Sequence, residues 1–174
     1  MNHIALIDEL YERYRSDVYR FLVKVSVGDA FVAEDLTQET FVQLYESLHR
    51  FRGECDIKTW IIAIAKNQWF TYCKKHKREQ TLAIENERFR VEAGLQLSER
   101  VEARETAKHA MLVLGKMPKK QADVVILRLF GELSFAEIAR MKKINESSAR
   151  VAFYRGKERL RTGLKEEYGY GLPL

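Results

Sequence analysis

Apolar residues recur every three or four positions along most of the chain, which is the spacing of one face of an α-helix. In the first half this pattern predicts three helices, over about residues 4–27, 31–48 and 59–77. In the second half it predicts a helical group with breaks at about residues 115–118, 131–133 and 143. No strand-like alternation persists for more than a few residues. The pattern therefore predicts an all-α fold.

A polar segment separates the two helical groups. From residue 79 to about residue 104 the chain has few large apolar side chains that could anchor a packed helix. We therefore predict two small helical domains, residues 1–79 and 105–174, joined by a flexible linker over residues 80–104. A fully extended linker of this length reaches about 80 Å at about 3.3 Å per residue, which is enough for the two domains to bind separate targets.

Composition supports ordered helices and sets the compartment. The chain has 174 residues, of which 46% are hydrophobic and only two are Pro. No apolar run approaches the roughly 18 residues of a membrane-spanning helix, and the N-terminal sequence lacks the layout of a secretory signal. Two cysteines are too few for a disulfide framework and fit a reducing compartment. We therefore expect a cytoplasmic protein.

Charge is distributed unevenly along the chain, whose formal net charge is +5. Residues 29–46 contain five acidic side chains and no Lys or Arg, whereas residues 66–78 contain five basic side chains and no acidic ones. Residues 115–165 contain thirteen basic and five acidic side chains. Basic blocks commonly bind polyanions, although a solvated helix face is an equally simple interpretation.

The segment at residues 134–161 has the pattern of a helix-turn-helix. Ser134 and Glu137 have the spacing of a capping box, which predicts a short helix, and Asn145 can cap a second, longer one. One side of the longer helix is small or apolar and the other is polar and basic, which suits a DNA major groove about 12 Å wide. The candidate DNA-binding residues are Ser147, Ser148, Arg150, Tyr154, Arg155 and Lys157. A helical hairpin with a solvated basic face is the alternative.

The acidic block also has a helical pattern. Asp35, Gln38, Glu39 and Val42 fall on one face together with Glu46, and mostly small or apolar residues fall opposite. A solvated face is the usual explanation of such a stripe. A protein interface is the other, because carboxylates bind Arg-rich partner surfaces through charge-assisted hydrogen bonds.

Several motifs together resemble one known family. They are AEDLTQETF (residues 33–41), FRG (residues 51–53), W-x-x-x-I-A-K-N (residues 60–67), the basic run that follows, and the C-terminal helix-turn-helix. Their order closely resembles the bacterial extracytoplasmic-function (ECF, group 4) sigma factors of RNA polymerase, members of the sigma-70 family. The resemblance extends over about residues 10–164. It implies a protein that binds core RNA polymerase, recognises the −35 and −10 promoter elements and helps to melt the promoter.

The resemblance also implies roles for individual residues. It assigns Asp35, Gln38, Glu39 and Val42 to core polymerase, and the helix-turn-helix to the −35 element. For the −10 element it implies that the loop at residues 51–58 forms a pocket for a base turned out of the duplex, and that the helix after it contacts the melted strand. The −10 residues implied are Phe51, Arg52, Gly53, Lys66, Asn67, Thr71 and Lys74.

At several positions the chain departs from the usual family pattern. Ala63 replaces a common basic residue, Thr71 a usual Asp, and Lys142 an apolar residue. Residues 147–149, Ser-Ser-Ala, stand where Gly-Thr-Val is usual. The resemblance therefore implies where promoter DNA binds but not which promoter sequence.

The partners implied are core RNA polymerase, promoter DNA in duplex and melted form, and a cognate anti-sigma factor, which is often anchored in the membrane. Two other interpretations stay open from the residues. One is a helix-turn-helix repressor or activator without sigma activity. The other is a zinc-stabilised module or metal-dependent enzyme that uses His49, Cys55, Cys73 and His76. Because no catalytic motif stands out, we expect no enzymatic activity, no cofactor and no metal.

Overall fold

The computed structural model describes the backbone of residues 3–84 and 98–170, and the side chains of residues 5–76 and 102–170. Within these segments every regular element is helical, which confirms the all-α prediction. The elements are α1 (His3–Val25), α2 (Ala30–Ser47), the 3₁₀-helix η1 (Leu48–Arg50), α3 (Ile57–Ile84), α4 (Ser98–Lys116), α5 (Lys119–Leu129), α6 (Phe135–Lys142) and α7 (Glu146–Tyr168). None of the helices described is both long and apolar enough to cross a membrane.

Two helices are longer than the apolar pattern predicts. α3 continues to Ile84 rather than ending near Lys77, and α4 begins at Ser98 rather than near Glu105. Both extensions, residues 78–84 and 98–104, lack Gly and Pro and consist mainly of good helix formers. They have no continuous apolar face, so periodicity could not reveal them. The remainder of the predicted linker, residues 85–97, lies outside the described residues.

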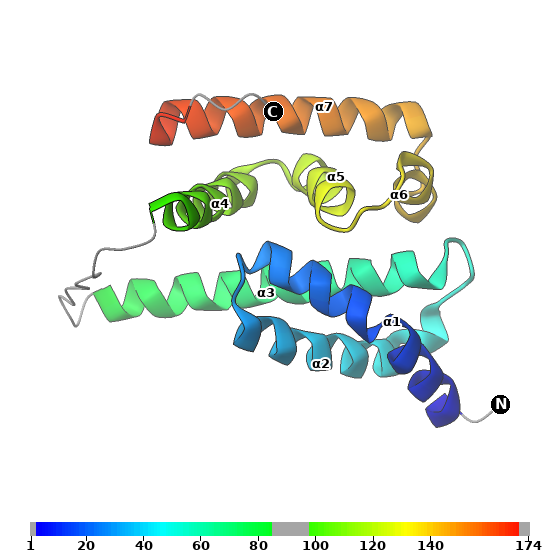
Figure 1. Cartoon of the computed structure of the whole chain (residues 1–174). Helices are drawn as coiled ribbons and strands as arrows, with labels where there is room; N and C mark the ends of the chain where they lie inside the picture. Colours follow the sequence, from blue (N-terminus) through cyan, green and yellow to red (C-terminus); the bar gives the residue numbers. More distant parts are fainter. Residues whose placement is uncertain (1–2, 85–97, 171–174) are drawn as a thin grey trace.

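The first domain is a bundle of α1, α2 and α3 (Figure 1). Asp29 begins α2 as its N-cap, because its carboxylate accepts a hydrogen bond from the Val32 N–H at 3.0 Å. The three helices pack around an apolar core. Its fully buried side chains include Val18, Leu22, Ala33, Leu44 and Ile61. This packing turns one face of α2 inward and leaves the other to solvent.

The second domain contains α4 to α7, and α6 and α7 form the predicted helix-turn-helix. Ser134 and Glu137 make a complete capping box at the start of α6, and Asn145 caps α7. Between the two helices Lys143 adopts a left-handed φ of 54°, a conformation that glycine or asparagine adopts more easily. α7 lies very close to α5, because a Cβ on Gly156 would be only 2.6 Å from Val125 Cγ2.

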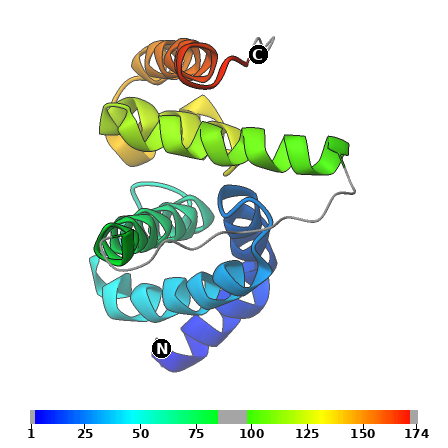
Figure 2. The ribbon, with the colours of Figure 1, turned by 90° about the vertical axis from the view of Figure 1, so that its left-hand side faces the viewer.

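The two domains are stacked, with α3 of the first against α5 and α6 of the second (Figure 1). Figure 2, at right angles, shows the same two layers, with α7 on the outer side of the second domain, away from the first. The backbone of the second domain at Gly131 lies close to the side chain of Ile62 in the first, since a Cβ on Gly131 would be 3.1 Å from Ile62 Cγ2. α3 is therefore covered on two sides, by its own domain and by the other.

Candidate polymerase and promoter interfaces

The outer face of α2 carries the residues predicted to bind polymerase. Asp35, Gln38 and Glu39 are exposed, and Val42 is 53% exposed. The opposite face is buried and consists of Ala33, Leu36, Thr37, Thr40, Phe41 and Leu44. The two buried threonine hydroxyls donate to the carbonyls four residues earlier, each at 2.6 Å, so no polar group is left unpaired there. The core thus holds α2 so that the acidic stripe points outward.

The carboxylates on this face are available to a partner. In the part of the chain whose side chains are described, neither Asp35 nor Glu39 forms an ion pair, whereas the neighbouring Glu34 binds Arg15 at 2.7 Å. Two large apolar side chains lie on the same side, Phe31 at 92% exposure and Tyr45 at 53%. Sequence reasoning missed both, although their helical spacing from Asp35 and Val42 could have indicated them.

The loop between η1 and α3 borders a cavity. Phe51 packs on Trp60, with ring centroids 5.0 Å apart, while Arg52 and Gly53 are exposed. Gly53 has a left-handed φ of 71°, which glycine adopts without steric penalty. The cavity, of about 250 Å³, is lined by loop residues and by side chains from the end of α6. A hollow therefore lies where the resemblance implies a pocket for a base, and one of its walls belongs to the second domain.

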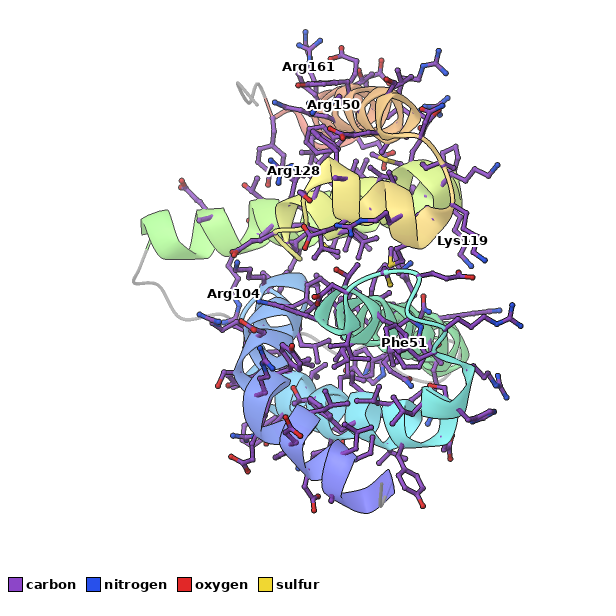
Figure 3. All side chains as sticks on the ribbon, turned by 90° about the vertical axis from the view of Figure 1, so that its right-hand side faces the viewer. Phe51, Arg104, Lys119, Arg128, Arg150 and Arg161 are labelled. Atoms are coloured by element: carbon purple, nitrogen blue, oxygen red, sulfur yellow. The ribbon has the colours of Figure 1, made fainter. Side chains whose placement is uncertain are left out.

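Most of the predicted −10 residues on α3 share one exposed face. Asn67, Thr71 and Lys74 are exposed one turn apart, and the Thr71 hydroxyl donates to the Asn67 carbonyl at 3.0 Å. They line a groove of about 450 Å³, whose far wall comes from the second domain and includes Met117 and Lys119. Figure 3 labels Lys119 near the boundary between the domains. In this arrangement the second domain borders the exposed face of α3.

Lys66 differs from the other predicted DNA contacts because it is buried. Lys66 is 3% exposed, and its ammonium donates a hydrogen bond to Asp123 Oδ1 on α5 at 2.6 Å. Asp123 is 1% exposed and also binds the ammonium of Lys142 at the end of α6. Burial lowers the pKa of Lys66 below its ordinary value, although Asp123 acts in the opposite direction. Burial raises the pKa of Asp123, but the hydrogen bonds from Lys142 and Lys66 outweigh it and the pKa lies below its ordinary value.

Asp123 is a functional candidate that the sequence reasoning missed. It is flanked by Ala122 and by the apolar run at residues 124–127, all buried, so it is the acidic residue of an otherwise apolar helix face. A charge in such a position is costly unless it is paired. An isolated Asp inside an apolar run of a basic domain was therefore the available signal, although it could not identify the partner.

α7 presents its predicted DNA-binding residues outward. Ser147, Ser148, Tyr154 and Arg155 are exposed, and Lys157 is half-buried. The other predicted residue on this helix is also exposed: Arg150 pairs with Glu146 at 2.5 Å and stacks over Phe135 at 4.8 Å. Figure 3 labels Arg150 and Arg161 on α7, at the end of the molecule opposite the first domain. The basic face of α7 is therefore accessible, while α3 is partly covered by the second domain.

Comparison with known proteins identifies the two domains. The family model "Sigma-70 region 2" matches residues 10–79, and "Sigma-70, region 4" matches residues 110–160. The chain is 30% identical over 156 residues to the ECF RNA polymerase sigma factor SigM of Bacillus subtilis, covering 89% of this chain and 93% of that protein. The chain belongs to the ECF sigma factors. A second relative, the RNA polymerase sigma factor YlaC of the same organism, is 27% identical over 168 residues, or 94% of this chain and 95% of that one.

Membership of this family makes the chain an alternative sigma factor, which acts in promoter recognition and transcription initiation. The match of the first domain to region 2 disfavours an ordinary helix-turn-helix repressor, which would have no reason to carry that domain. The predicted family, with its two helical domains and C-terminal helix-turn-helix, is thus confirmed.

Solved structures of sigma factors share the fold. The sigma factor RpoE of Bartonella quintana, solved with the anti-sigma factor NepR, has a TM-score of 0.56 at 18% identity, covering 92% of this chain and 97% of that one. CnrH, solved with the cytosolic domain of CnrY, has a TM-score of 0.54 at 16% identity, covering 91% and 87%. At these identities the likeness concerns the fold.

The zinc interpretation depended on two cysteines and two histidines. Both Cys55 and Cys73 are free and half-buried, and burial raises the pKa of the Cys73 thiol to about 11. Among the side chains of residues 5–76 and 102–170, no three His, Cys, Asp or Glu are grouped closely enough to hold a metal ion. A buried thiol with a raised pKa is also a poor metal ligand, because metals bind the thiolate.

Proposed function

We propose that this sigma factor binds core RNA polymerase through the outer face of α2 and recognises promoter DNA with two further surfaces. Residues 51–58 and the exposed face of α3 bind the −10 element, and the outer face of α7 binds the −35 element. The single observation that carries the proposal is the outer face of α2. Its four predicted residues are all exposed on a helix whose opposite face is buried in the core.

The α2 face suits a basic protein partner. Within the described side chains Asp35 and Glu39 form no ion pair, and charge-assisted bonds to Arg or Lys are about twice as strong as neutral ones. Phe31, Val42 and Tyr45 add exposed apolar area beside these charges. Interfaces combine such apolar centres with a polar rim, and DNA would repel the acidic stripe. Polymerase is therefore the partner of this face, and the basic surfaces are for DNA.

At the −10 element, Asn67 hydrogen-bonds a base edge and Lys66 and Lys74 neutralise phosphates, while Thr71 leaves room for a single strand to approach. Phe51 and Arg52 line the cavity that accepts an extruded base, and Gly53 allows the turn of the loop beside them. Extrusion costs a few kcal/mol, so a preformed pocket lowers the cost of opening the promoter.

At the −35 element, α7 enters the major groove with its N-terminal end. Ser147 and Ser148 bind a phosphate near the start of the helix, and Arg150, Arg155 and Lys157 contact phosphates or guanine edges. Tyr154, exposed on the same face, contacts the groove. The accessibility of this face supports the assignment.

The remaining partners follow from the family. RpoE is solved with an anti-sigma factor, which supports a cognate anti-sigma factor for this chain. The chain works in the bacterial cytoplasm, held at the membrane where its anti-sigma factor is anchored there. It contributes binding surfaces and no catalytic group or cofactor.

The test is the affinity of full-length protein for purified core polymerase. Asp35→Arg should weaken binding at least about tenfold, because it places a cation against a basic partner surface. Phe31→Ala should weaken it by a smaller factor. Both positions are exposed, so circular dichroism should be unchanged.

The matched control is Glu166→Arg, the same reversal of charge at an exposed position of α7. It should bind core polymerase like the unmodified chain. If Asp35→Arg binds as tightly as this control, the outer face of α2 is not the polymerase interface.

A further inference from the structure

Three charged side chains meet where the two domains pack. Lys66 comes from α3 of the first domain, Asp123 from α5 and Lys142 from the end of α6 of the second. Each lysine binds a different oxygen of the Asp123 carboxylate, Lys66 at 2.6 Å and Lys142 on the other side. Lys66 and Asp123 are both at least 97% buried, so water screens this pair very little.

Two exposed ion pairs flank this cluster and also join the domains. Lys24 of α1 binds Glu132, and Glu54 of the loop before α3 binds Lys143 at 2.8 Å. Exposed pairs like these stabilise a contact by little. Removing one partner of the buried cluster should therefore weaken closure more than removing either exposed pair.

The cluster depends on Asp123. Two ammonium groups share one carboxylate, so removing that carboxylate leaves a buried, unpaired charge, which is strongly unfavourable. The lowered pKa of Lys66 indicates that its charge is already costly in this position.

The closed arrangement conflicts with promoter binding. Lys66 is fully engaged by Asp123, and the groove along Asn67, Thr71 and Lys74 has a wall from the second domain. The resemblance to the family implies promoter elements about one and a half to two duplex turns apart, at about 34 Å per turn, so we expect the domains to separate when both elements are bound.

We propose that Asp123 is an intramolecular latch: its carboxylate takes the place of a DNA phosphate at Lys66 and Lys142, holds the two domains closed and keeps the melted strand away from α3. When the latch opens, DNA phosphates replace the Asp123 carboxylate as the anions bound by the two lysines. Both lysines then become available to DNA phosphates, while Asp123 becomes exposed. The DNA half of this proposal rests on the −10 assignment of α3, but the latch itself does not.

The latch is tested by carbodiimide cross-linking of the full-length chain. The reagent activates a carboxylate, and a contacting lysine amine displaces it as a urea to leave an amide bond. In the unmodified chain, mass spectrometry should find Lys24 linked to Glu132 and Lys143 linked to Glu54. Asp123→Asn keeps the shape of the side chain and removes its charge. It should lower the yields of both cross-links between the domains at least about fivefold.

Cross-links inside each domain serve as the internal control. Lys58 contacts Asp17 within the first domain at 2.9 Å, and Lys116 contacts Glu167 within the second. Both yields should be unchanged in Asp123→Asn. Unchanged yields between the domains, with the in-domain links intact, would overturn the latch.

Two further variants keep the test decisive if Asp123→Asn perturbs folding. Lys66→Asp leaves the second domain unmodified and places a second carboxylate against that of Asp123. The two carboxylates repel each other, so this variant should also lower the cross-link yields between the domains. The triple variant Lys66→Met, Asp123→Leu, Lys142→Met should restore them to at least the original level, because apolar side chains often replace buried ions without loss. Loss of closure in the triple variant, or persistent closure in Lys66→Asp, contradicts the proposal.

The DNA half is tested with a fluorescent single strand of mixed sequence, about 20 nucleotides long, at fixed salt. Asp123→Asn should bind it about threefold to tenfold more tightly than the unmodified chain, with a steeper salt dependence. Glu166→Gln, which makes the same change of charge on α7, should not. If cross-links between the domains fall while DNA affinity equals that of Glu166→Gln, the latch stands, and the −10 assignment and the phosphate mimicry by Asp123 both fail.

Discussion

α3 and α7 are both long helices with basic side chains, yet the structure treats them differently. α3 packs on α1 and α2 along one side and on α5 and α6 along another. α7 packs on α4, α5 and α6 along one side and leaves the other to solvent. On α7 Arg155 is exposed, whereas on α3 Lys66 is 3% exposed.

The difference shows that a basic helix is not automatically a free DNA-binding surface. The sequence of each helix predicts a polyanion contact, but availability depends on what packs on it. In this conformation the basic face of α7, proposed to bind the −35 element, is accessible, and that of α3, proposed to bind the −10 element, is partly covered. If both proposals hold, recognition of duplex and capture of a melted strand are controlled separately in one chain.

The buried side of α3 can be tested through Cys73, which lies on it. Burial raises the pKa of this thiol from its ordinary 9.0 to about 11. At pH 8 the thiolate fraction is then about 0.1% rather than about 10%, so alkylation by iodoacetamide should be about a hundredfold slower than for an exposed thiol. Peptide mass spectrometry after timed alkylation measures the rate.

Cys55 provides the comparison within the same chain. Burial also raises the pKa of Cys55, but Cys55 lies in the loop before α3 and not on the packed side of that helix, so it should react faster than Cys73. The raised pKa of Cys73 also sets a pH dependence. Below its ordinary pKa the thiol is neutral in both states, and as pH rises from about 9 to about 11 only the unfolded chain ionises, so stability falls across that window. Equal rates for the two cysteines would mean that α3 is not seated as described.

The packed side of α7 depends on Gly156. A Cβ here would lie 2.6 Å from Val125 Cγ2 on α5, so Gly156→Leu forces the two helices apart. Overpacking of this kind costs about 2 kcal/mol, or about thirtyfold in the folding equilibrium constant. Urea unfolding followed by circular dichroism measures the loss.

Gly115 is the matched control in the same domain. It lies in α4 with no atom within 4 Å of an added Cβ. Gly115→Ala should therefore stabilise the helix slightly, by about 0.5–1 kcal/mol, because alanine is the better helix former. If Gly156→Leu instead stabilised the protein as Gly115→Ala does, helix propensity rather than contact with α5 would decide the effect at Gly156.

The helix-turn-helix and the outer face of α2 could be predicted from the sequence, because both depend on residues close together in the chain. The capping box at Ser134 and the cap at Asn145 fix the helix-turn-helix, and both occur as predicted. The acidic stripe on α2 was predicted from period alone, since a helix with one apolar face can pack in only one orientation. The break predicted near residue 143 corresponds to the left-handed turn at Lys143.

The rest depends on contacts between residues distant in sequence. Lys66 and Asp123 are 57 positions apart, and helical periodicity contains no information about which helices of two domains meet. Polar extensions such as residues 78–84 of α3 have no apolar stripe to reveal them. Burial of Lys66 was therefore beyond sequence reasoning, while the identity of Lys66 as a phosphate contact stays a prediction.

The open side of α7 can be tested with Arg155→Ala. Arg155 is exposed on the face predicted to enter the major groove, and a good Arg contact to a base or phosphate contributes about 1–3 kcal/mol. Affinity of the reconstituted holoenzyme for a promoter duplex selected from a library should fall about tenfold. Affinity for core polymerase should not change, because α2 lies in the other domain.

Lys165→Ala removes a charge from the same helix almost three turns further along, at an exposed position past the predicted groove contacts. It should lower duplex affinity much less than Arg155→Ala, and equally for every sequence, because a distant cation acts only through the general field. Arg155→Ala could also weaken all duplexes alike and lower the slope of log affinity against log salt by about the contribution of one phosphate. In that case Arg155 contacts the DNA backbone rather than a base. If it leaves duplex affinity unchanged, the accessible face of α7 is solvated rather than bound, and the contrast with α3 is one of packing alone.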